Sequence, residues 1–239
     1  MVAVFYLEFL SKFHERLRPR TYLEIRVAQG YSLAVSRCQS IGIDPELHVT
    51  QQLISPSVLI RSTSDDYFAQ LASDEATPFG ELPVDFGYID GLHHFEYALR
   101  DFIGLERYSA TSSVVAFDDI LPRNTDEAAR ERHTQEWTGD VFRVQFALAA
   151  HRPDLVQIRV NTEPTGTLLV VGLDPESHAL VYQMDDILRT YVTPDPQVLP
   201  PEILSRSTTI TPERALELTI WDELRESRSD TVPESSGVA

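Results

Sequence analysis

The sequence predicts an α/β fold: a mostly parallel, doubly wound sheet with helices on both faces and an antiparallel strand near the C-terminal end. Two observations lead to this prediction. Short apolar runs that are typical of buried strands alternate along the chain with helical patterns. The last two apolar runs, 155–161 and 167–173, are separated only by a Thr-Glu-Pro-Thr-Gly turn, which is typical of a hairpin. At 239 residues, the chain is long enough for one large domain.

Three parts of the chain are expected: an N-terminal amphipathic helix at 1–20, the sheet domain at 21–193, and a C-terminal extension at 194–239. The composition of 227–239 is typical of a disordered tail. Within the sheet domain, the expected strands are 20–27, 40–44, 57–64, 84–90, 112–119, 155–161 and 167–173. The expected helices are 30–38, 65–73, 94–108 and 139–151, while the charged segment 125–137 is expected to be helical or to form a lid.

Composition excludes several classes of protein. The net charge of −17 argues against a nucleic-acid binder and against attachment to an anionic membrane. No run approaches the ~20 apolar residues of a transmembrane helix. Cys38 is the only cysteine, so no intrachain disulfide can form, and a reducing cytoplasm is expected. Lys12 is the only lysine, which leaves none near the candidate site described next.

Carboxylates end two neighbouring apolar runs. Asp90 ends VDFGYID, and Asp118 with Asp119 ends SSVVAFDD; the segment between the two runs is typical of a crossover helix. Adjacent parallel strands lie ~4.8 Å apart, and open α/β sheets bind ligands at their carboxyl edge. Three oxygen donors at that edge suit Mg²⁺ or a similar divalent cation. The alternative is that the Asp-Asp pair is a polar strand end or a helix cap.

A glycine turn follows the first expected strand. In YLEIRVAQGYS, Gly30 would let a ligand approach the backbone, and the following helix start would favour an anionic group. Asp44 ends the next strand, where an acidic residue commonly accepts hydrogen bonds from ribose hydroxyls. Either residue alone would be explained by an ordinary turn or a surface position. Together and in this order they favour nucleoside binding.

The segments YLEIRVAQG, GIDP, YIDGLHHFEYALRDF and VVAFDDI resemble the class I S-adenosylmethionine-dependent methyltransferases. Within that group, the chain is most similar to the small metal-dependent O-methyltransferases, which include catechol-type and antibiotic-sugar enzymes. The resemblance spans roughly residues 21–173, and it implies the Rossmann-like methyltransferase fold. It is most specific at 90–101 and at Asp118-Asp119.

The resemblance also implies roles for individual residues. It places five residues at the cofactor: Glu24, Gly30 and Ser32 at the methionine part, Asp44 at the ribose and Asp65 near the adenine. The implied metal ligands are Asp90, Asp118 and Asp119. His93 stands where catechol-type members place a basic catalytic residue. One departure is Arg26, because the family usually has glycine at this position, beside the methionine tail.

Other residues near the motifs have less specific interpretations. His94 is expected to be structural or to face the substrate, and Asn124 to contact the substrate or to serve a turn. Trp137 is interpreted as a half-buried packing residue, with a place in a lid over the site as the alternative.

These observations predict an S-adenosylmethionine- and divalent-metal-dependent O-methyltransferase that acts on a hydroxyl of a sugar or glycosylated small molecule. A cation bound to the acceptor would lower its hydroxyl pKa, and His93 would remove the proton. A homodimer is expected. The alternatives are a metal enzyme similar to cephalosporin hydroxylases, a non-catalytic Rossmann-type binding protein in which Arg26 disables the cofactor pocket, and a nucleotide-sugar enzyme.

Overall fold

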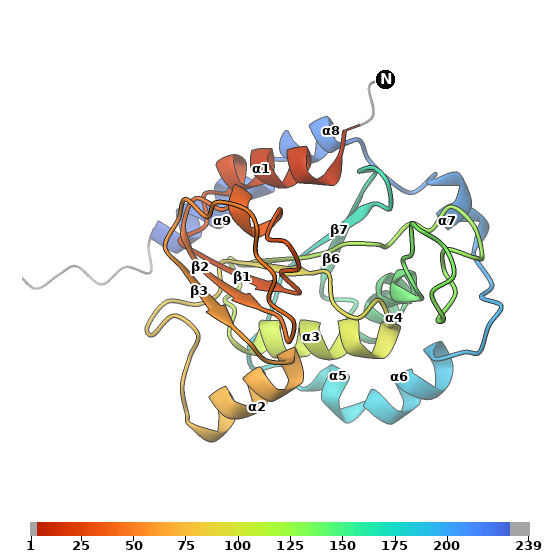
Figure 1. Ribbon diagram of the computed structural model, residues 1–239, viewed down its shortest axis with the longest axis horizontal. Helices are drawn as coiled ribbons and strands as arrows, with labels where there is room; N and C mark the ends of the chain where they lie inside the picture. The colour runs from red at the N-terminus through yellow and green to blue at the C-terminus, as the bar shows by residue number, and fades with distance from the viewer. Residues whose placement is uncertain (1–3, 230–239) are drawn as a thin grey trace, which may run out of the picture.

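The computed structural model describes residues 4–229, which form a seven-stranded sheet in the order β3-β2-β1-β4-β5-β7-β6 (Figure 1). Strands β1 to β5 pair in parallel, whereas β7 pairs antiparallel with both β5 and β6. The strands are β1 (Thr21–Ile25), β2 (Gln39–Ile43), β3 (Ser57–Ile60), β4 (Phe86–Ile89), β5 (Val114–Phe117), β6 (Val156–Val160) and β7 (Thr167–Val171). The predicted mostly parallel sheet with an antiparallel strand near the C-terminal end is therefore confirmed.

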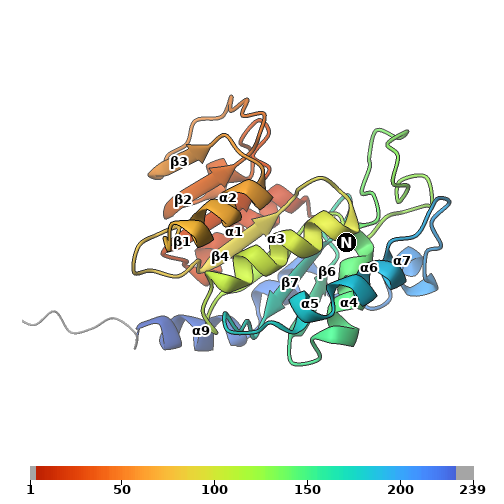
Figure 2. The same ribbon diagram turned by 90° about the horizontal axis from the view of Figure 1, so that it is seen from below.

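Helices cover both faces of this sheet (Figures 1 and 2). On one face lie α1 (Tyr6–Leu17), α8 (Pro212–Leu216) and α9 (Ile220–Ser229). The other face is covered by α2 (Ser64–Ser73), α3 (Phe95–Arg107), α4 (Val144–His151), α5 (Ala179–Tyr182), α6 (Met184–Tyr191) and α7 (Pro201–Ser205). None of the helices between residues 4 and 229 is long and apolar enough to span a lipid bilayer.

Side-chain alternation along the strands divides the core into two layers. In β5, Val115 and Phe117 pack into the layer beneath α3, and Val114 and Ala116 pack into the layer beneath α1. All four side chains are fully buried. Because successive residues of a strand point to opposite faces, a central strand of a doubly wound sheet is apolar throughout. This is why the short apolar runs predicted the strands well.

Two predicted helices differ in the structure. Residues 30–38 form only a short 3₁₀ helix, η1 (Leu33–Val35), because the serine hydroxyls on either side bond to the sheet. Ser32 donates to Glu24 over 2.7 Å, and Ser36 lies 2.8 Å from the Ser40 hydroxyl. The segment 125–137 contains turns and no helix, in agreement with the alternative expectation of a lid. The predicted helix at 139–151 begins as a 3₁₀ turn, η2 (Val141–Arg143), and continues as α4.

The C-terminal extension contributes to the core. Trp221 of α9 is fully buried, makes an edge contact with Phe13 of α1 at 5.0 Å between ring centroids, and donates its indole N–H to the Ala215 carbonyl. The expected disordered tail at 227–239 falls partly on α9, which ends at Ser229, and the rest lies outside the described residues. Burial of a tryptophan stabilises the packing of α9 on α1.

His14 of α1 points into the aromatic layer between this helix and the sheet. Its ring makes edge contacts with Tyr22 and Phe86, and neither ring nitrogen has a hydrogen-bond partner among residues 4–229. Burial, aided by the nearby Arg37 charge, lowers its pKa from 6.5 to about 3. The folded protein therefore keeps His14 neutral where the unfolded chain would protonate it.

This difference predicts a loss of stability in acid. Below pH 6.5 the unfolded state binds a proton that folded His14 rejects, so His14 alone should lower the free energy of unfolding by about 2 kcal/mol at pH 5. Replacing it in H14F should flatten the dependence of stability on pH between 6.5 and 4, as measured by urea denaturation. The matched control H48Q, at an exposed histidine, should keep the wild-type slope. An H14F slope equal to that of the wild type would contradict this assignment.

Candidate active site

The site lies where β1, β4 and β5 end side by side. Ile25, Ile89 and Phe117 are partners across these strands, so the residues that follow them emerge next to each other. The ladder continues for one more step, because the Asp90 N–H donates to the Ile25 carbonyl at 3.2 Å and the Asp118 N–H donates to the Ile89 carbonyl at 3.0 Å. The register of three parallel strands therefore determines where these side chains start.

The two carboxylates that end β5 point in different directions. Asp118 continues the strand and accepts a hydrogen bond from the Tyr88 hydroxyl at 2.8 Å, on the α1 side of the sheet. Its other oxygen, Oδ1, is buried without a hydrogen-bond partner among the described residues. Asp119 adopts a left-handed backbone conformation with φ of 62°, which turns the chain and directs its carboxylate to His93. Two of the three predicted metal ligands therefore point in different directions, Asp118 toward Tyr88 and Asp119 toward His93.

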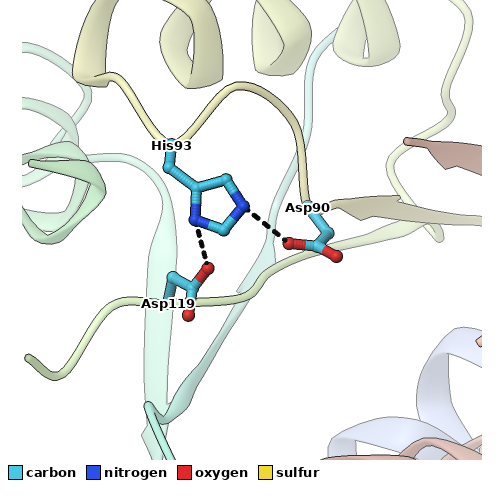
Figure 3. Close-up of side chains that lie close together, drawn as sticks. All are labelled: Asp90, His93 and Asp119. Atoms are coloured by element: carbon cyan, nitrogen blue, oxygen red, sulfur yellow. Dashed lines mark ion pairs between the residues drawn. The ribbon is translucent and has the colours of Figure 1, made fainter. Parts of the chain in front are cut away.

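His93 lies between two of the predicted carboxylates (Figure 3). Its Nδ1 is 2.7 Å from Oδ2 of Asp119, and its Nε2 is 3.5 Å from Oδ1 of Asp90. The side chain is only 9% exposed, and the residue has a positive φ of 56° in the loop before α3. The loop thus brings the His93 imidazole back to the end of β4, next to Asp90.

Arg26 enters the same group of side chains. Its Nη1 is 2.7 Å from His93 Nε2, and 3.3 and 3.4 Å from the two carboxylate oxygens of Asp90. A guanidinium can only donate hydrogen bonds, so Nε2 of His93 must accept, and the neutral ring carries its proton on Nδ1, facing Asp119. A histidine held in this way by a carboxylate presents Nε2 as a proton acceptor.

Negative charge is in excess here. Burial, reinforced by Asp119 and Asp90, raises the pKa of Asp118 well above its ordinary value. Burial also raises the pKa of Asp90 to about 6, although His93 and Arg26 partly offset it. Burial opposes protonation of His93, but the neighbouring carboxylates outweigh it and raise the pKa of the imidazole. A further positive charge would stabilise this group of carboxylates.

A divalent cation fits these residues. Asp90, His93 and Asp119 each offer one ligand atom, and these atoms lie within 4.8 Å of one another. A small cavity of about 10 Å³ is lined by the same three residues together with Asp118, whose Oδ1 lacks a partner within residues 4–229. Carboxylate oxygens and a neutral imidazole nitrogen are common ligands of divalent metals.

Glu24 and Ser32, predicted at the cofactor, contact each other directly. Ser32 donates to one carboxylate oxygen of Glu24 and the Tyr22 hydroxyl to the other, both at 2.7 Å. Glu24 is fully buried, and burial raises its pKa to about 8, while the two hydroxyl donors act in the opposite sense. Gly30 has φ of 86°, and a Cβ there would lie 2.9 Å from the Val49 side chain. The loop from β1 to η1 is therefore anchored through Glu24.

Asp44 and Asp65 lie further along the same edge. Asp44 is buried at the end of β2 and accepts the backbone N–H groups of Ala28 and Glu46 at 2.8 and 2.7 Å. Because an ionised carboxylate has about four acceptor sites, these bonds leave capacity for a ligand hydroxyl. Asp65 stands at the start of α2 and forms a two-point ion pair with Arg100 of α3. Asp65 is thus the most exposed of the predicted cofactor residues, with a side chain 47% accessible.

Comparison with known proteins adds a similarity to a family. Residues 23–120 match the model of the family described as "Methyltransferase domain". The match covers less than half of the chain, so it shows a similarity of these residues to that family. Among curated proteins, none matches the chain in sequence.

Solved structures show the same fold. The O-methyltransferase from Bacillus cereus in complex with SAH is 16% identical, with a TM-score of 0.52 over 70% of this chain and 80% of that one. A putative O-methyltransferase from Klebsiella pneumoniae has the same identity and TM-score, over 73% and 82% of the two chains. The O-methyltransferase TomG from Streptomyces achromogenes, involved in tomaymycin synthesis and in complex with SAM, is 19% identical, with a TM-score of 0.50 over 70% and 79%. The expected Rossmann-like methyltransferase fold is confirmed.

The lid segment, residues 125–137, covers the imidazole of His93. Trp137 stacks on the His93 ring with 4.9 Å between centroids and 12° between planes, and its indole N–H donates to the Ala129 carbonyl. His94 Nε2 lies 3.0 Å from the Arg130 carbonyl, which ties the lid to the start of α3. Asn124 accepts the Glu127 N–H with its side-chain oxygen, so it serves a turn in this structure. Trp137 is half-buried and packs on His93, in agreement with its main interpretation as a packing residue, and this position is also compatible with the alternative of a lid.

Two tyrosines beside the candidate site carried no signal in the sequence. Tyr88 points from the middle of β4 to Asp118, whereas its apolar neighbours made it look like a core residue. Tyr6 opens α1, and burial together with Asp118, Asp90 and Asp119 raises its pKa. Its place beside these carboxylates depends on how α1 packs on the sheet, which no local motif encodes.

Gly139 sets how closely the lid approaches His93. It has φ of 55°, and a Cβ at this position would lie 1.6 Å from the His93 carbonyl oxygen. G139A should therefore lose about 1–2 kcal/mol from the left-handed conformation and a further 1–3 kcal/mol, roughly, from the steric conflict. Gly80 is a matched control, because it has φ of 66° and a Cβ added there would have no atom within 4 Å. Urea denaturation should show G139A clearly less stable than G80A, and equal stabilities would refute the contact.

Proposed function

We propose that the chain is an S-adenosylmethionine-dependent O-methyltransferase whose acceptor is a hydroxyl of a small molecule. The observation that carries the proposal is the His93–Asp119 pair, which presents a proton-accepting Nε2 at the carboxyl edge of a methyltransferase domain. O-Methyltransferases with bound SAH or SAM have the same fold, which is consistent with this chemistry.

The proposed reaction is a direct displacement. The acceptor oxygen forms a bond to the methyl carbon while the carbon–sulfur bond breaks, and the sulfonium becomes a neutral thioether. The hydroxyl proton passes to Nε2 of His93, and Asp119 beside Nδ1 stabilises the imidazolium that forms. Trp137 stacked on the ring holds its orientation. Much of the remaining acceleration would come from alignment of oxygen, carbon and sulfur.

A divalent cation, Mg²⁺ or a similar ion, belongs to this proposal. Asp90, Asp118 and Asp119 would hold it, as the sequence predicted, since all three line one cavity and Asp118 Oδ1 has no partner in the described chain. When bound, a cation supplies the charge that lowers the pKa of an acceptor hydroxyl. His93 then keeps the role of base beside the cation.

For the cofactor we propose the roles that the resemblance implies. Glu24, Gly30 and Ser32 would face the methionine part, Asp44 the ribose and Asp65 the adenine. The support is their order along the carboxyl edges of β1 and β2 and at the start of α2, together with the free acceptor capacity of Asp44.

For the acceptor we propose a sugar or a glycosylated metabolite. The carboxylates and histidines that surround the cavity suit a ligand with several hydroxyl groups. His94 and Asn124 are proposed substrate contacts, reached through movement of the lid that both residues anchor. Cytoplasmic location and a homodimer stay predictions from the sequence.

The direct test is methyl transfer from isotopically labelled S-adenosylmethionine to a panel of hydroxylated acceptors. H93Q should reduce kcat by about 10²–10⁴-fold, because the general base is lost, with little effect on cofactor affinity. H133Q changes an exposed lid histidine and should retain wild-type turnover. Absence of cofactor binding at millimolar concentration would instead support the non-catalytic alternative that Arg26 suggests. Product oxidation without label transfer would support the hydroxylase alternative.

The role of the cation has its own test. Chelation with EDTA should abolish turnover, and added Mg²⁺ should restore it. D118N should remove most of the metal-dependent rate and leave S-adenosylmethionine affinity, measured by calorimetry, largely unchanged. The control D126N changes an exposed carboxylate of the lid and should behave as wild type. Full activity in EDTA would exclude the cation from the mechanism.

A further inference from the structure

Arg26 has the backbone conformation of a glycine. Its φ is 69°, in the left-handed region, while its N–H still donates to the Ile43 carbonyl at 2.8 Å. This conformation costs an ordinary L-residue roughly 1–2 kcal/mol. The backbone of the turn after β1 therefore has the conformation that a glycine would adopt, but the residue at this position carries a long cationic side chain.

That side chain points into the candidate cation site. Its Nη1 contacts both carboxylate oxygens of Asp90, the Asp90 carbonyl and Nε2 of His93. Two of the three residues that can hold a metal are thus in contact with a single guanidinium nitrogen. A divalent cation at Asp90 would lie beside this charge, and two cations cannot both be well stabilised there.

The guanidinium is held at this place only weakly. All of its side-chain hydrogen bonds within residues 4–229 go to Asp90 and His93, and those to Asp90 are 3.3 Å or longer. Its side chain is 39% exposed, whereas the ion-paired guanidinium of Arg152 is 2% exposed. Arg26 can therefore move into solvent without leaving a buried charge unpaired.

We propose that Arg26 is an internal cation that occupies the position of the divalent metal at the Asp90 carboxylate and covers Nε2 of His93, and that metal binding expels it. This inference rests on the cation site of the proposed function. With Arg26 in place, the carboxylates are partly neutralised and Nε2 of His93 is capped. When the metal replaces Arg26, the same event that loads the cation also frees the proposed base.

The exchange lowers the apparent metal affinity. A ligand whose site is open only part of the time binds more weakly in proportion to the open fraction. Removing the guanidinium charge removes this competition and leaves the carboxylates more negative. R26K, whose side chain is shorter but still charged, should preserve the competition with the metal, because the competition depends on positive charge.

The test is Mn²⁺ binding to the full chain, followed by calorimetry and by the electron paramagnetic resonance of free Mn²⁺. R26Q should bind Mn²⁺ about two- to fivefold more tightly than wild type, since a partly exposed ion pair is lost. R26G should show the same gain and is expected to fold well, because glycine accepts a φ of 69°. R26K should stay near wild type. The matched control is R61Q, at an exposed arginine of the same edge whose one side-chain hydrogen bond within residues 4–229 goes to the Pro45 carbonyl.

Two results would overturn the proposal: folded R26Q and R26G with wild-type Mn²⁺ affinity, or R26K with the same gain as R26Q. Cofactor binding and methyl transfer are measured separately on the same proteins. Tighter metal binding by R26Q without label transfer to any acceptor would support the exchange and contradict the methyltransferase proposal. Label transfer with unchanged metal affinity would support the methyltransferase proposal and contradict the exchange.

Discussion

The in-register ends of β1, β4 and β5 are the constraint on which the site depends. Ile25, Ile89 and Phe117 are paired across the sheet, so Arg26, Asp90 and Asp118 must leave it at one level. Parallel pairing at ~4.8 Å spacing then places these charged groups next to one another at the carboxyl edge of the sheet. Burial raises the pKa of Asp90 and Asp118 because it destabilises the charged carboxylates. A cation beside them would offset this destabilisation. The guanidinium of Arg26 is the group that meets this need in the structure.

The second organising feature is the lid between β5 and α4. Arg130 bridges Glu96 and Asp140, while Asp140 accepts the Phe95 N–H at the start of α3. These contacts hold Trp137 flat against His93, so an irregular segment fixes the orientation of the imidazole. The backbone N–H groups of Arg130 and Glu131 also donate to Asp195, so the lid is attached to the start of α3 and to the segment after α6.

Local patterns predicted much of the site, and the reason is topological. Asp90 and Asp119 were identified from their positions at the ends of apolar runs and His93 from the family resemblance, and the structure places the three within ligand distance of one another. Asp118 was predicted beside them, yet it points to Tyr88, because consecutive residues of a strand face opposite sides. Residues 30–38 were predicted to be helical from their apolar spacing. In the structure, the hydroxyls of Ser32 and Ser36 instead form hydrogen bonds with side chains of β1 and β2, which local helix propensity does not take into account.

The sequence by itself determined the alternation of strands and helices, the antiparallel hairpin near the end, and the residues that end each strand. These depend on periodicity and turn chemistry, which act over a few residues. Only the tertiary structure decided the state of the site. The stacking of Trp137 on His93, the approach of Tyr6 to the carboxylates and the reach of Arg26 to Asp90 join segments far apart in the chain. Such contacts depend on how whole elements pack, and Arg26 in particular was visible in the sequence only as a missing glycine.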